Sequence, residues 1–307
     1  MSAPIVVTVP ATTANLGPGF DCLGAALKLY NQFSFTPLNA PAGFQSTKVT
    51  GEEAVRVTTD KSNLVYRAFA YFFEQQQQPI PAIEISISLN VPLARGLGSS
   101  STAIVGGLLG ANHLAKNPLQ KAEILALATS LEGHPDNVVP ALLGGCQLAV
   151  EDNGYLTLCP LTWHRSIAIV VGIPNFELST ESARSVLPQQ YSRADAIFNV
   201  AHLGLLLRAL EEGNGEWLSQ AMNDRIHQPY RKTLIPGYDA VARATKAAGA
   251  YGLVISGAGP TLLALTDANS SDAVKHAFMN TWQQLKVEAR VLSLTLDTEG
   301  AQVTVSH

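Results

Sequence analysis

The sequence predicts an α+β protein with two closely packed domains, the first over residues 1–155 and the second over residues 156–307. Strand and helix signals alternate in the first half and recur in the second, and no internal repeat or long linker interrupts them. The length of 307 residues also favours two domains, because a single hydrophobic core stops growing at about 250–300 residues. The expected boundary is the polar segment 151–155, which Pro160 follows.

Several segments are predicted strands because they are rich in β-branched residues or alternate in polarity. The clearest is residues 83–89, in which isoleucine or leucine at every second position alternates with glutamate or serine. This period of two indicates a strand with one buried face. The predicted strands are residues 5–10, 29–35, 83–89, 167–173, 253–256 and 262–265, with further strand signal over 287–296.

Helices are predicted from capping residues and apolar runs. Ser62 or Asn63 can cap a helix that ends at the glutamines 75–78, and Asn117-Pro118 predicts another helix start. The uncharged residues 96–115 are long enough to span a bilayer, but five glycines and several polar residues leave only 103–111 continuously apolar. That stretch predicts a buried core helix. Further helices are expected over residues 191–211, 216–223, 238–248 and 272–285.

The composition excludes several classes of protein. Lys and Arg number 20 against 24 Asp and Glu, a net charge of −4, and only 14% of the residues are charged. Such a chain is too apolar for disorder and too acidic for a general nucleic-acid binder. Its three cysteines do not make a disulfide framework, and the N-terminus lacks the features of a signal peptide. We therefore expect a cytoplasmic protein without nucleic-acid or membrane partners.

Residues 92–102 carry the densest functional signal. This segment, PLARGLGSSST, follows the strand at 83–89 and enters the apolar helix. Glycines let the backbone approach an anion closely, and the free N–H groups at a helix start then face it. A Rossmann fingerprint would need a third glycine at Ser101, and a Walker loop would need a lysine. The segment predicts phosphate binding, with a tight turn before a packed helix as the structural alternative.

Two other glycine segments accompany this loop. Residues 10–21, PATTANLGPGFD, place Asn15 and Asp21 in an irregular loop, and residues 256–261, SGAGPT, lie between two predicted strands. Either segment alone is typical of a turn. Three such segments in one chain favour a shared functional site.

At these segments the sequence resembles the GHMP kinases, the family of galactokinase, homoserine kinase, mevalonate kinase and phosphomevalonate kinase. The resemblance implies an N-terminal ribosomal-protein-S5-like domain and a C-terminal ferredoxin-like domain, with ATP and Mg²⁺ as cofactors. Asn63 is added as a candidate purine contact. The ATP-binding residues are then Asn63, Pro92, Leu93, Ala94, Arg95, Gly96, Leu97, Gly98, Ser99, Ser100, Ser101, Thr102, Gly257 and Gly259.

Within the family the resemblance is closest to the homoserine kinase branch, on residues 10–21, 132–141 (EGHPDNVVPA), 179–184 (STESAR) and 228–231 (QPYR). It implies ATP-dependent phosphorylation of the hydroxyl of L-homoserine in threonine biosynthesis. Some relatives have a longer loop between the glutamate and the histidine of the second motif. The substrate-binding residues that it implies are Asn15, Asp21, His134, Asn137, Thr180, Arg184 and Arg231.

The residue types suit such a substrate and reaction. The guanidinium groups of Arg184 and Arg231 can hold a carboxylate, and Asp21 can accept from an ammonium or a hydroxyl group. Phosphoryl transfer through a loose transition state needs positioning and electrostatic stabilisation more than a base.

Asn15, Asn137 and Glu132 are therefore the expected catalytic residues, although other family members carry an aspartate near Asn137. Hard oxygens suit Mg²⁺, and Ser100 and Glu132 are its expected ligands.

Two alternatives remain open at this point: a GHMP kinase acting on another small alcohol, and a non-catalytic amino-acid or nucleotide sensor on the same fold. Cys22 invites a nucleophilic role, but no basic residue adjoins it in sequence. The oligomeric state is open, with a homodimer as one candidate. The histidines without metal-ligand spacing, which are expected to be structural, are His113, His164, His202, His227, His276 and His307.

Overall fold

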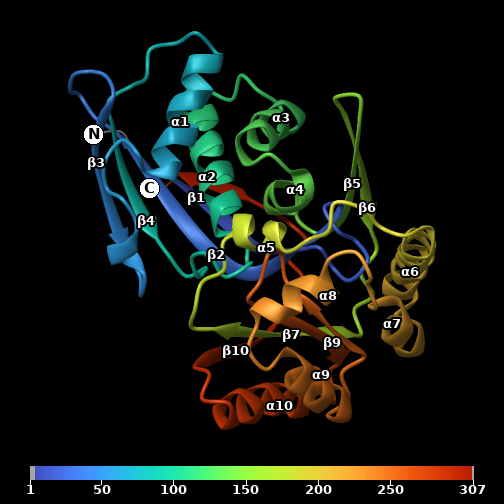
Figure 1. Ribbon diagram of the computed structural model, residues 1–307. Coiled ribbons are helices and arrows are strands. Elements are labelled where there is room, and N and C mark those ends of the chain that lie inside the picture. Colours follow the sequence, from blue (N-terminus) through green and yellow to red (C-terminus); the bar gives the residue numbers. More distant parts are fainter. Residues whose placement is uncertain (1–3, 306–307) are drawn as a thin grey trace.

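A seven-stranded sheet and a four-stranded sheet organise the chain, which the computed structural model describes over residues 4–305 (Figure 1). The predicted α+β class is confirmed. The first sheet and its helices comprise β1 (Ile5–Ala14), β2 (Leu23–Pro37), β3 (Phe44–Thr50), a 3₁₀ turn (Ala54–Arg56), α1 (Leu64–Gln75), β4 (Ile83–Ser88), α2 (Ser99–Leu114), α3 (Lys121–Glu132), α4 (Pro135–Leu143), β5 (Cys146–Asp152), β6 (Tyr155–Leu161) and β11 (Gln302–Val305).

The strands of the first sheet run in the order β11-β1-β2-β4-β3, and β5 and β6 extend from β2 as a hairpin. All pairs are antiparallel except β3 and β4. Helices α1 to α4 cover one face of this sheet (Figure 1). Phenylalanines of β2 and α1, including Phe35 and Phe69, fill the space between the layers at 0% exposure.

The second sheet is antiparallel, in the order β10-β7-β9-β8. Helices α9 and α10 lie on its outer face (Figure 1), where Phe278 and Trp282 pack so closely on Gly172 that a Cβ there would meet the indole at 2.4 Å. Its elements are β7 (Ile167–Pro174), α5 (Thr180–Ser185), α6 (Arg193–Glu212), α7 (Gly215–Ala221), α8 (Gln228–Arg231), a 3₁₀ turn (Lys232–Leu234), α9 (Tyr238–Ala247), β8 (Gly252–Ile255), β9 (Leu262–Asp267), α10 (Ser271–Gln284) and β10 (Ala289–Leu294).

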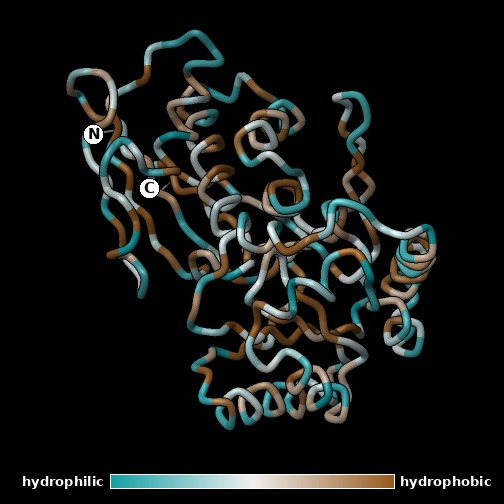
Figure 2. Tube along the Cα trace, in the orientation of Figure 1, coloured by the Kyte–Doolittle hydropathy of each residue, from teal (hydrophilic) through white to brown (hydrophobic). Residues whose placement is uncertain are grey.

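One hydrophobic core joins the two sheets. Leu23 and Leu27 of β2 belong to the same buried cluster as Ile169 and Val171 of β7 and Leu263 of β9, together with residues of α6 and α7. Hydrophobic segments accordingly run through the middle of the molecule, whereas the outer turns are hydrophilic (Figure 2). Burying so much apolar surface at the junction stabilises the packing of one sheet on the other.

Two sequence expectations differ from the structure. The helix predicted at Asn117-Pro118 begins at Lys121 instead, because Gln120 and Glu123 form a capping box and Asn117 takes a left-handed φ of 55°. Residues 151–155 form the tip of the β5–β6 hairpin, with Asn153 and Gly154 as its turn, and do not connect the two sheets.

The division into 1–155 and 156–307 stays a prediction, but the sheets do not follow it. Strand β11 and all of β6 except Tyr155 fall in the second predicted domain, although both strands lie in the first sheet. Among residues 4–305, no helix is long and apolar enough to cross a membrane. The uncharged stretch forms α2, a buried helix as predicted.

Candidate active site

The glycine loop between β4 and α2 is held by backbone contacts from three distant segments. The carbonyl of Leu97 accepts from the amide of Thr12 at 3.1 Å, that of Arg95 from Thr261 at 3.3 Å, and that of Ala94 from Leu178 at 3.2 Å. The glycine segments that the sequence singled out thus meet at one place. The structure thus brings 10–21, 92–102 and 256–261 into contact, and their shared function stays a prediction.

Two loop positions need glycine. Gly96 and Gly98 have φ values of +75° and +67°, and a Cβ would lie 2.1 Å from the carbonyl of Ser256 and 1.9 Å from Oγ1 of Thr12. Gly98 is also the N-cap of α2 and has no side chain with which to satisfy the first amides of that helix. Those amides, at Ser99 to Ser101, are free to bind an anion.

A cavity of about 130 Å³ lies at this helix start. Asn137, Thr180 and Glu132 line it together with the loop and with Gly257 and Ala258. A second cavity of about 360 Å³, lined by Leu64, Leu93, Ala94, Ser99, Ser100 and residues 178–180, shares several of these residues and therefore adjoins the first. The pair provides a small polar compartment beside a larger, more apolar one.

Glu132 anchors two serines of the helix start. Its carboxylate accepts hydrogen bonds from Ser100 Oγ at 2.9 Å and from Ser101 Oγ at 3.0 Å. Adjacent ligands of an octahedral Mg²⁺ with bonds of about 2.1 Å lie roughly 3 Å apart. The oxygens of Ser100 and Glu132 are spaced as such a pair requires, so these residues fit a magnesium ion. Such an ion would need further oxygens from water or phosphate, because no cluster of three or more His, Cys, Asp or Glu side chains occurs in the described chain.

Asn137 is fixed at both ends of its amide. Thr12 Oγ1 donates to its Oδ1 at 2.7 Å, and its Nδ2 donates to the carboxylate of Asp136 at 3.3 Å. Asp136 is only 3% exposed. Burial and the nearby Asp21 carboxylate raise the pKa of Asp136 to about 6. Sequence reasoning missed both Thr12 and Asp136 as supports of this amide, although both lie inside the motifs it used.

Asp21 and Arg184 form a bidentate ion pair. Nη1 and Nη2 of Arg184 donate to the two carboxylate oxygens at 2.9 and 2.8 Å. Asn15 is 5% exposed; its Oδ1 accepts from the amide of Asp21 at 2.8 Å and its Nδ2 donates to the carbonyl of Gly257 at 3.0 Å. Asn15 and Asp21 both have positive φ, 60° and 56°, so this loop is tightly shaped.

His134 stands at the N-cap of α4 and lines, with Asp21 and Cys22, a neighbouring cavity of about 360 Å³. Burial raises the pKa of Cys22 to about 11, with the Asp136 and Asp21 carboxylates adding to the effect. A thiol with so high a pKa is a poor nucleophile at neutral pH. The neighbouring cavity is therefore better suited to binding a polar ligand than to covalent chemistry at Cys22.

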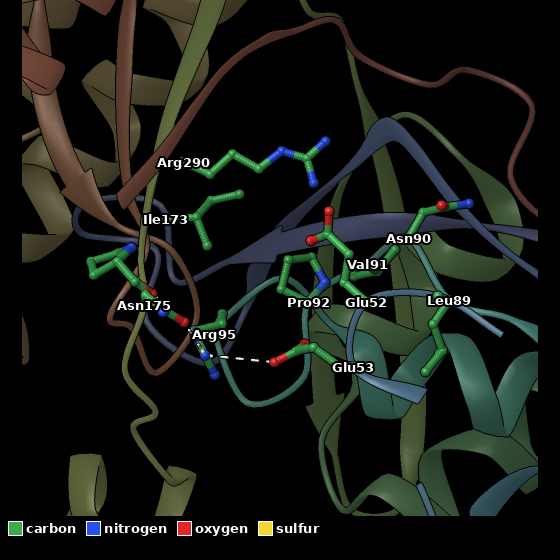
Figure 3. A pocket seen from close by; sticks show the side chains of 12 residues that line it. Glu52, Glu53, Leu89, Asn90, Val91, Pro92, Arg95, Ile173, Asn175 and Arg290 are labelled. Carbon is green, nitrogen blue, oxygen red and sulfur yellow. Dashed lines mark hydrogen bonds and ion pairs between the residues drawn. The ribbon is translucent and has the colours of Figure 1, made fainter. Parts of the chain in front are cut away.

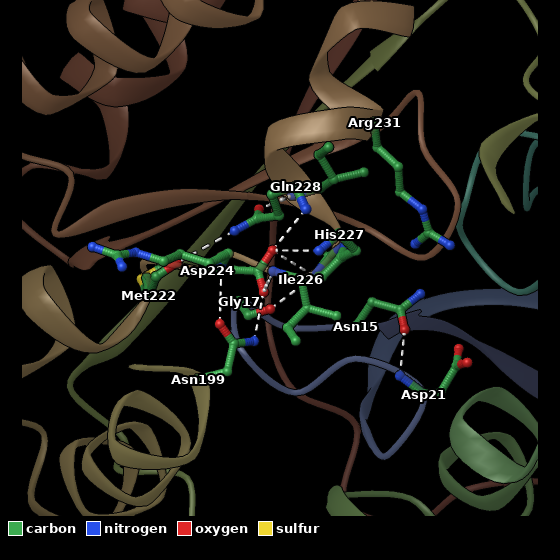
Figure 4. Close-up of polar contacts among 12 residues, drawn as sticks. Asn15, Gly17, Asp21, Asn199, Met222, Asp224, Ile226, His227, Gln228 and Arg231 are labelled. Atoms are coloured by element: carbon green, nitrogen blue, oxygen red, sulfur yellow. Dashed lines mark hydrogen bonds and ion pairs between the residues drawn. The ribbon is translucent and has the colours of Figure 1, made fainter. Parts of the chain in front are cut away.

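Arg231 is buried, at 1% exposure, and lies against the glycine segment 256–261. Its Nε donates to the carbonyl of Ala183 and its Nη1 to that of Gly257, each at 3.1 Å. Figure 4 shows its guanidinium on the same side as Asn15 and Asp21. Burial lowers the pKa of Arg231 to about 10, so the group remains charged at neutral pH.

Arg95 and Asn63 both make contacts that hold the fold, and Arg95 also lines the small cavity at the start of α2. Arg95 also lines another cavity, of about 430 Å³ (Figure 3). Its guanidinium donates there to Pro174 O at 3.0 Å and to Asn175 Oδ1 at 3.3 Å, and it lies 3.6 Å from the Glu53 carboxylate. Asn63 caps α1, accepting from the amides of Val65 and Tyr66. The purine contact assigned to Asn63 stays a prediction. His307 lies outside the described residues.

With this geometry established, the class of the protein follows from comparison with known families. The chain belongs to the GHMP kinase family: the family model of the GHMP kinases N-terminal domain matches residues 63–145, and that of the GHMP kinases C-terminal domain matches residues 206–284. The homoserine kinase of Nostoc punctiforme is 60% identical over 298 residues, which are 97% of each chain. That of a Synechococcus strain is 59% identical over 298 residues, again 97% of each. A solved homoserine kinase from Cytophaga hutchinsonii has a TM-score of 0.90 at 29% identity and covers 99% of this chain and 98% of its own.

Proposed function

We propose that the chain transfers the terminal phosphoryl group of ATP to the hydroxyl of L-homoserine, which yields O-phospho-L-homoserine for threonine biosynthesis. The observation that carries this proposal is the convergence of the predicted phosphate loop with Asn137 and Thr180 around one small cavity beside the Asp21–Arg184 pair. Relatives 58–60% identical over 97% of this chain bear the name homoserine kinase, which supports the choice of amino-acid substrate.

ATP binding is assigned to the two adjoining cavities. The phosphates would accept hydrogen bonds from the amides at Ser99 to Ser101, with the positive end of the α2 dipole behind them. The larger compartment beside Leu64 and Leu93 has the apolar walls that suit a purine base. We further propose Mg²⁺ at Ser100 and Glu132, where it would neutralise part of the phosphate charge.

The substrate is assigned to the Asp21–Arg184 pair and its surroundings. A zwitterionic amino acid carries both a carboxylate and an ammonium group. Its carboxylate can bind Arg184 and its ammonium can bind Asp21, in place of the ion pair between these two side chains. Nε of Arg184 is buried and has no hydrogen-bond partner within residues 4–305, which leaves a further donor for that carboxylate. Arg231 and Thr180 add a positive charge and a hydroxyl nearby, and His134 adds an imidazole to the cavity that Asp21 lines.

The reaction needs no carboxylate base at the acceptor hydroxyl. Asn137 and Asn15 can hold the hydroxyl through hydrogen bonds but cannot remove its proton, so the proton passes to a phosphoryl oxygen as the new P–O bond forms and the bond to ADP breaks. The chain contributes orientation and electrostatic stabilisation, which supply most of the rate in phosphoryl transfer.

The test is ADP release by the purified protein with homoserine, mevalonate or galactose as acceptor, with the phosphorylated product identified by ³¹P NMR. We expect turnover with homoserine alone. An Asn137→Leu variant prepared in parallel excludes a contaminating kinase. Turnover with another alcohol would favour a different GHMP kinase, and ligand binding without ADP release would favour a sensor. A cytoplasmic location and a homodimer are proposed as well, to be checked by fractionation and by sedimentation.

A further inference from the structure

We infer that His227 is a positioning residue that holds the substrate loop, residues 15–21, in the shape required to bind the amino acid. This imidazole lies outside the groups that line the cavities, and it is completely buried. Only the kinetic test of this inference, the measurement of the homoserine KM, rests on the proposed function. It concerns how a histidine far along the chain determines the placement of Asn15 and Asp21.

The contact between His227 and the loop is direct. Nε2 of His227 lies 2.8 Å from the carbonyl oxygen of Gly17, 210 residues away. Because a carbonyl can only accept, Nε2 carries the proton in this bond. Nδ1 is then the unprotonated nitrogen, and it has no hydrogen-bond partner among the residues that the structure describes. The imidazole thus makes one hydrogen bond, and that bond fixes the loop.

The ring makes a second contact with the same loop. It stacks on Phe20 with centroids 5.0 Å apart and planes inclined by 20°. The guanidinium carbons of Arg231 and Arg184 lie 4.9 and 5.6 Å from the centroid of Phe20. His227 therefore supports, through Phe20, the two arginines that are assigned to the substrate carboxylate.

The segment that carries His227 is itself rigid (Figure 4). The Asp224 carboxylate, completely buried, accepts from the amides of Ile226, His227 and Gln228 at 2.9, 2.9 and 2.6 Å and from Asn199 Nδ2 at 2.7 Å. A carboxylate with so many donors fixes the backbone on which the imidazole stands. The support for the loop is consequently built before any ligand arrives.

The charged groups around His227 are compatible with a neutral ring. Burial lowers the pKa of His227, and Arg231 adds to this, whereas Asp224, Asp21 and the Gly17 carbonyl oppose it. Asp224 Oδ2 is 3.6 Å from Nε2. A neutral ring with its proton on Nε2 is the form that donates to Gly17.

The experiment compares His227→Leu with His227→Gln. Glutamine places an N–H at a reach similar to that of Nε2, whereas leucine cannot donate. We expect His227→Leu to raise the homoserine KM at least tenfold and to change the ATP KM less than twofold. His227→Gln should keep the homoserine KM within threefold of the wild type. His202→Leu is the matched control, because that ring bonds only its own helix at Phe198 O and stacks on Phe198.

Equal homoserine KM values for His227→Leu and His227→Gln would overturn the inference, as would equal increases in the KM of both substrates. If His227→Leu does not fold, Phe20→Leu removes the ring through which His227 supports Arg184 and Arg231 and should again raise the homoserine KM selectively. Hydrogen exchange of the peptide spanning 15–21 separates this inference from the proposed function. Faster exchange in His227→Leu than in His227→Gln supports it even if homoserine is not the acceptor, and equal exchange contradicts it.

Discussion

Asp21 and Arg184, 163 positions apart, face each other through two parallel hydrogen bonds of 2.9 and 2.8 Å. Each side chain is 36% exposed, so an entering ligand can reach both. The pair satisfies the two charges in the absence of substrate and offers both to a zwitterion. It links the N-terminal loop to α5, two segments that the sequence motifs identified separately.

The first prediction concerns this pair. Arg184→Leu should raise the homoserine KM about 30-fold, roughly 2 kcal/mol, because a charge-assisted contact with the carboxylate is lost while Asp21 remains unpaired. Steady-state kinetics at saturating ATP measure this change. Arg193→Leu, at the exposed start of α6, is the control and should leave the KM unaltered. An unchanged homoserine KM in Arg184→Leu would rule out the assigned role.

The second prediction tests the magnesium ligands. Ser100→Ala should increase the Mg²⁺ concentration needed for half-maximal activity roughly tenfold, since one hard oxygen ligand is removed. Ser101→Ala is the matched variant, because Ser101 bonds the same Glu132 carboxylate but is not a proposed ligand. Titration of activity against free Mg²⁺ distinguishes the two. Identical curves for both variants would contradict the assignment.

The third prediction follows from Asp136. Its pKa is raised from 3.8 to about 6, so the unfolded chain releases this proton at lower pH than the folded chain does. The free energy of unfolding therefore decreases between pH 4 and 6, and the full penalty, roughly 2–3 kcal/mol, is present above pH 6. Asp136→Asn should remove it, so urea unfolding at pH 7.5 should show a more stable variant. At pH 4 the stabilities should be nearly equal; an equal difference at both pH values would show that charge is not the cause.

The fourth prediction concerns Gly98. Alanine there should cost more stability than a left-handed backbone alone, about 1–2 kcal/mol, because the added Cβ would meet Thr12 Oγ1 at 1.9 Å. Gly154→Ala is the control: its φ is +79°, and nothing lies within 4 Å of the added atom. Gly98→Ala should also lower kcat, since Thr12 would be displaced from Asn137. Equal unfolding free energies for the two variants would show that the loop relaxes around the methyl group.

Local signals made much of the fold predictable. Ser62 or Asn63 was predicted to cap the helix that follows, and it is the side chain of Asn63 that accepts from the first amides of α1. The alternation at 83–89 identified β4 because a buried face imposes that period on adjacent residues. Strand β11 was missed, since its four residues are ordered by pairing with β1 from the opposite end of the chain.

The site was predictable as a set of residues but not as an arrangement. The sequence motifs identified Asn137, Asp21 and Arg184 as candidate site residues, yet no local pattern shows that Arg184 pairs with Asp21. Arg95 illustrates the same limit, because its guanidinium is oriented by Pro174 and Asn175, which lie 79 and 80 positions away in the sequence. The support of His227 for Gly17 depends on a contact across 210 positions and has no local signature.

The return of β11 to the first sheet also connects the second sheet to the first at both ends of the segment that forms it. The chain leaves the first sheet after β6 and returns to it at β11, after the bridge between Leu27 and Leu296. Two chain segments therefore connect the second sheet to the first. Because the two sheets also share one buried core, a cut in either connection would leave the sheets joined by that core and by the other connection alone.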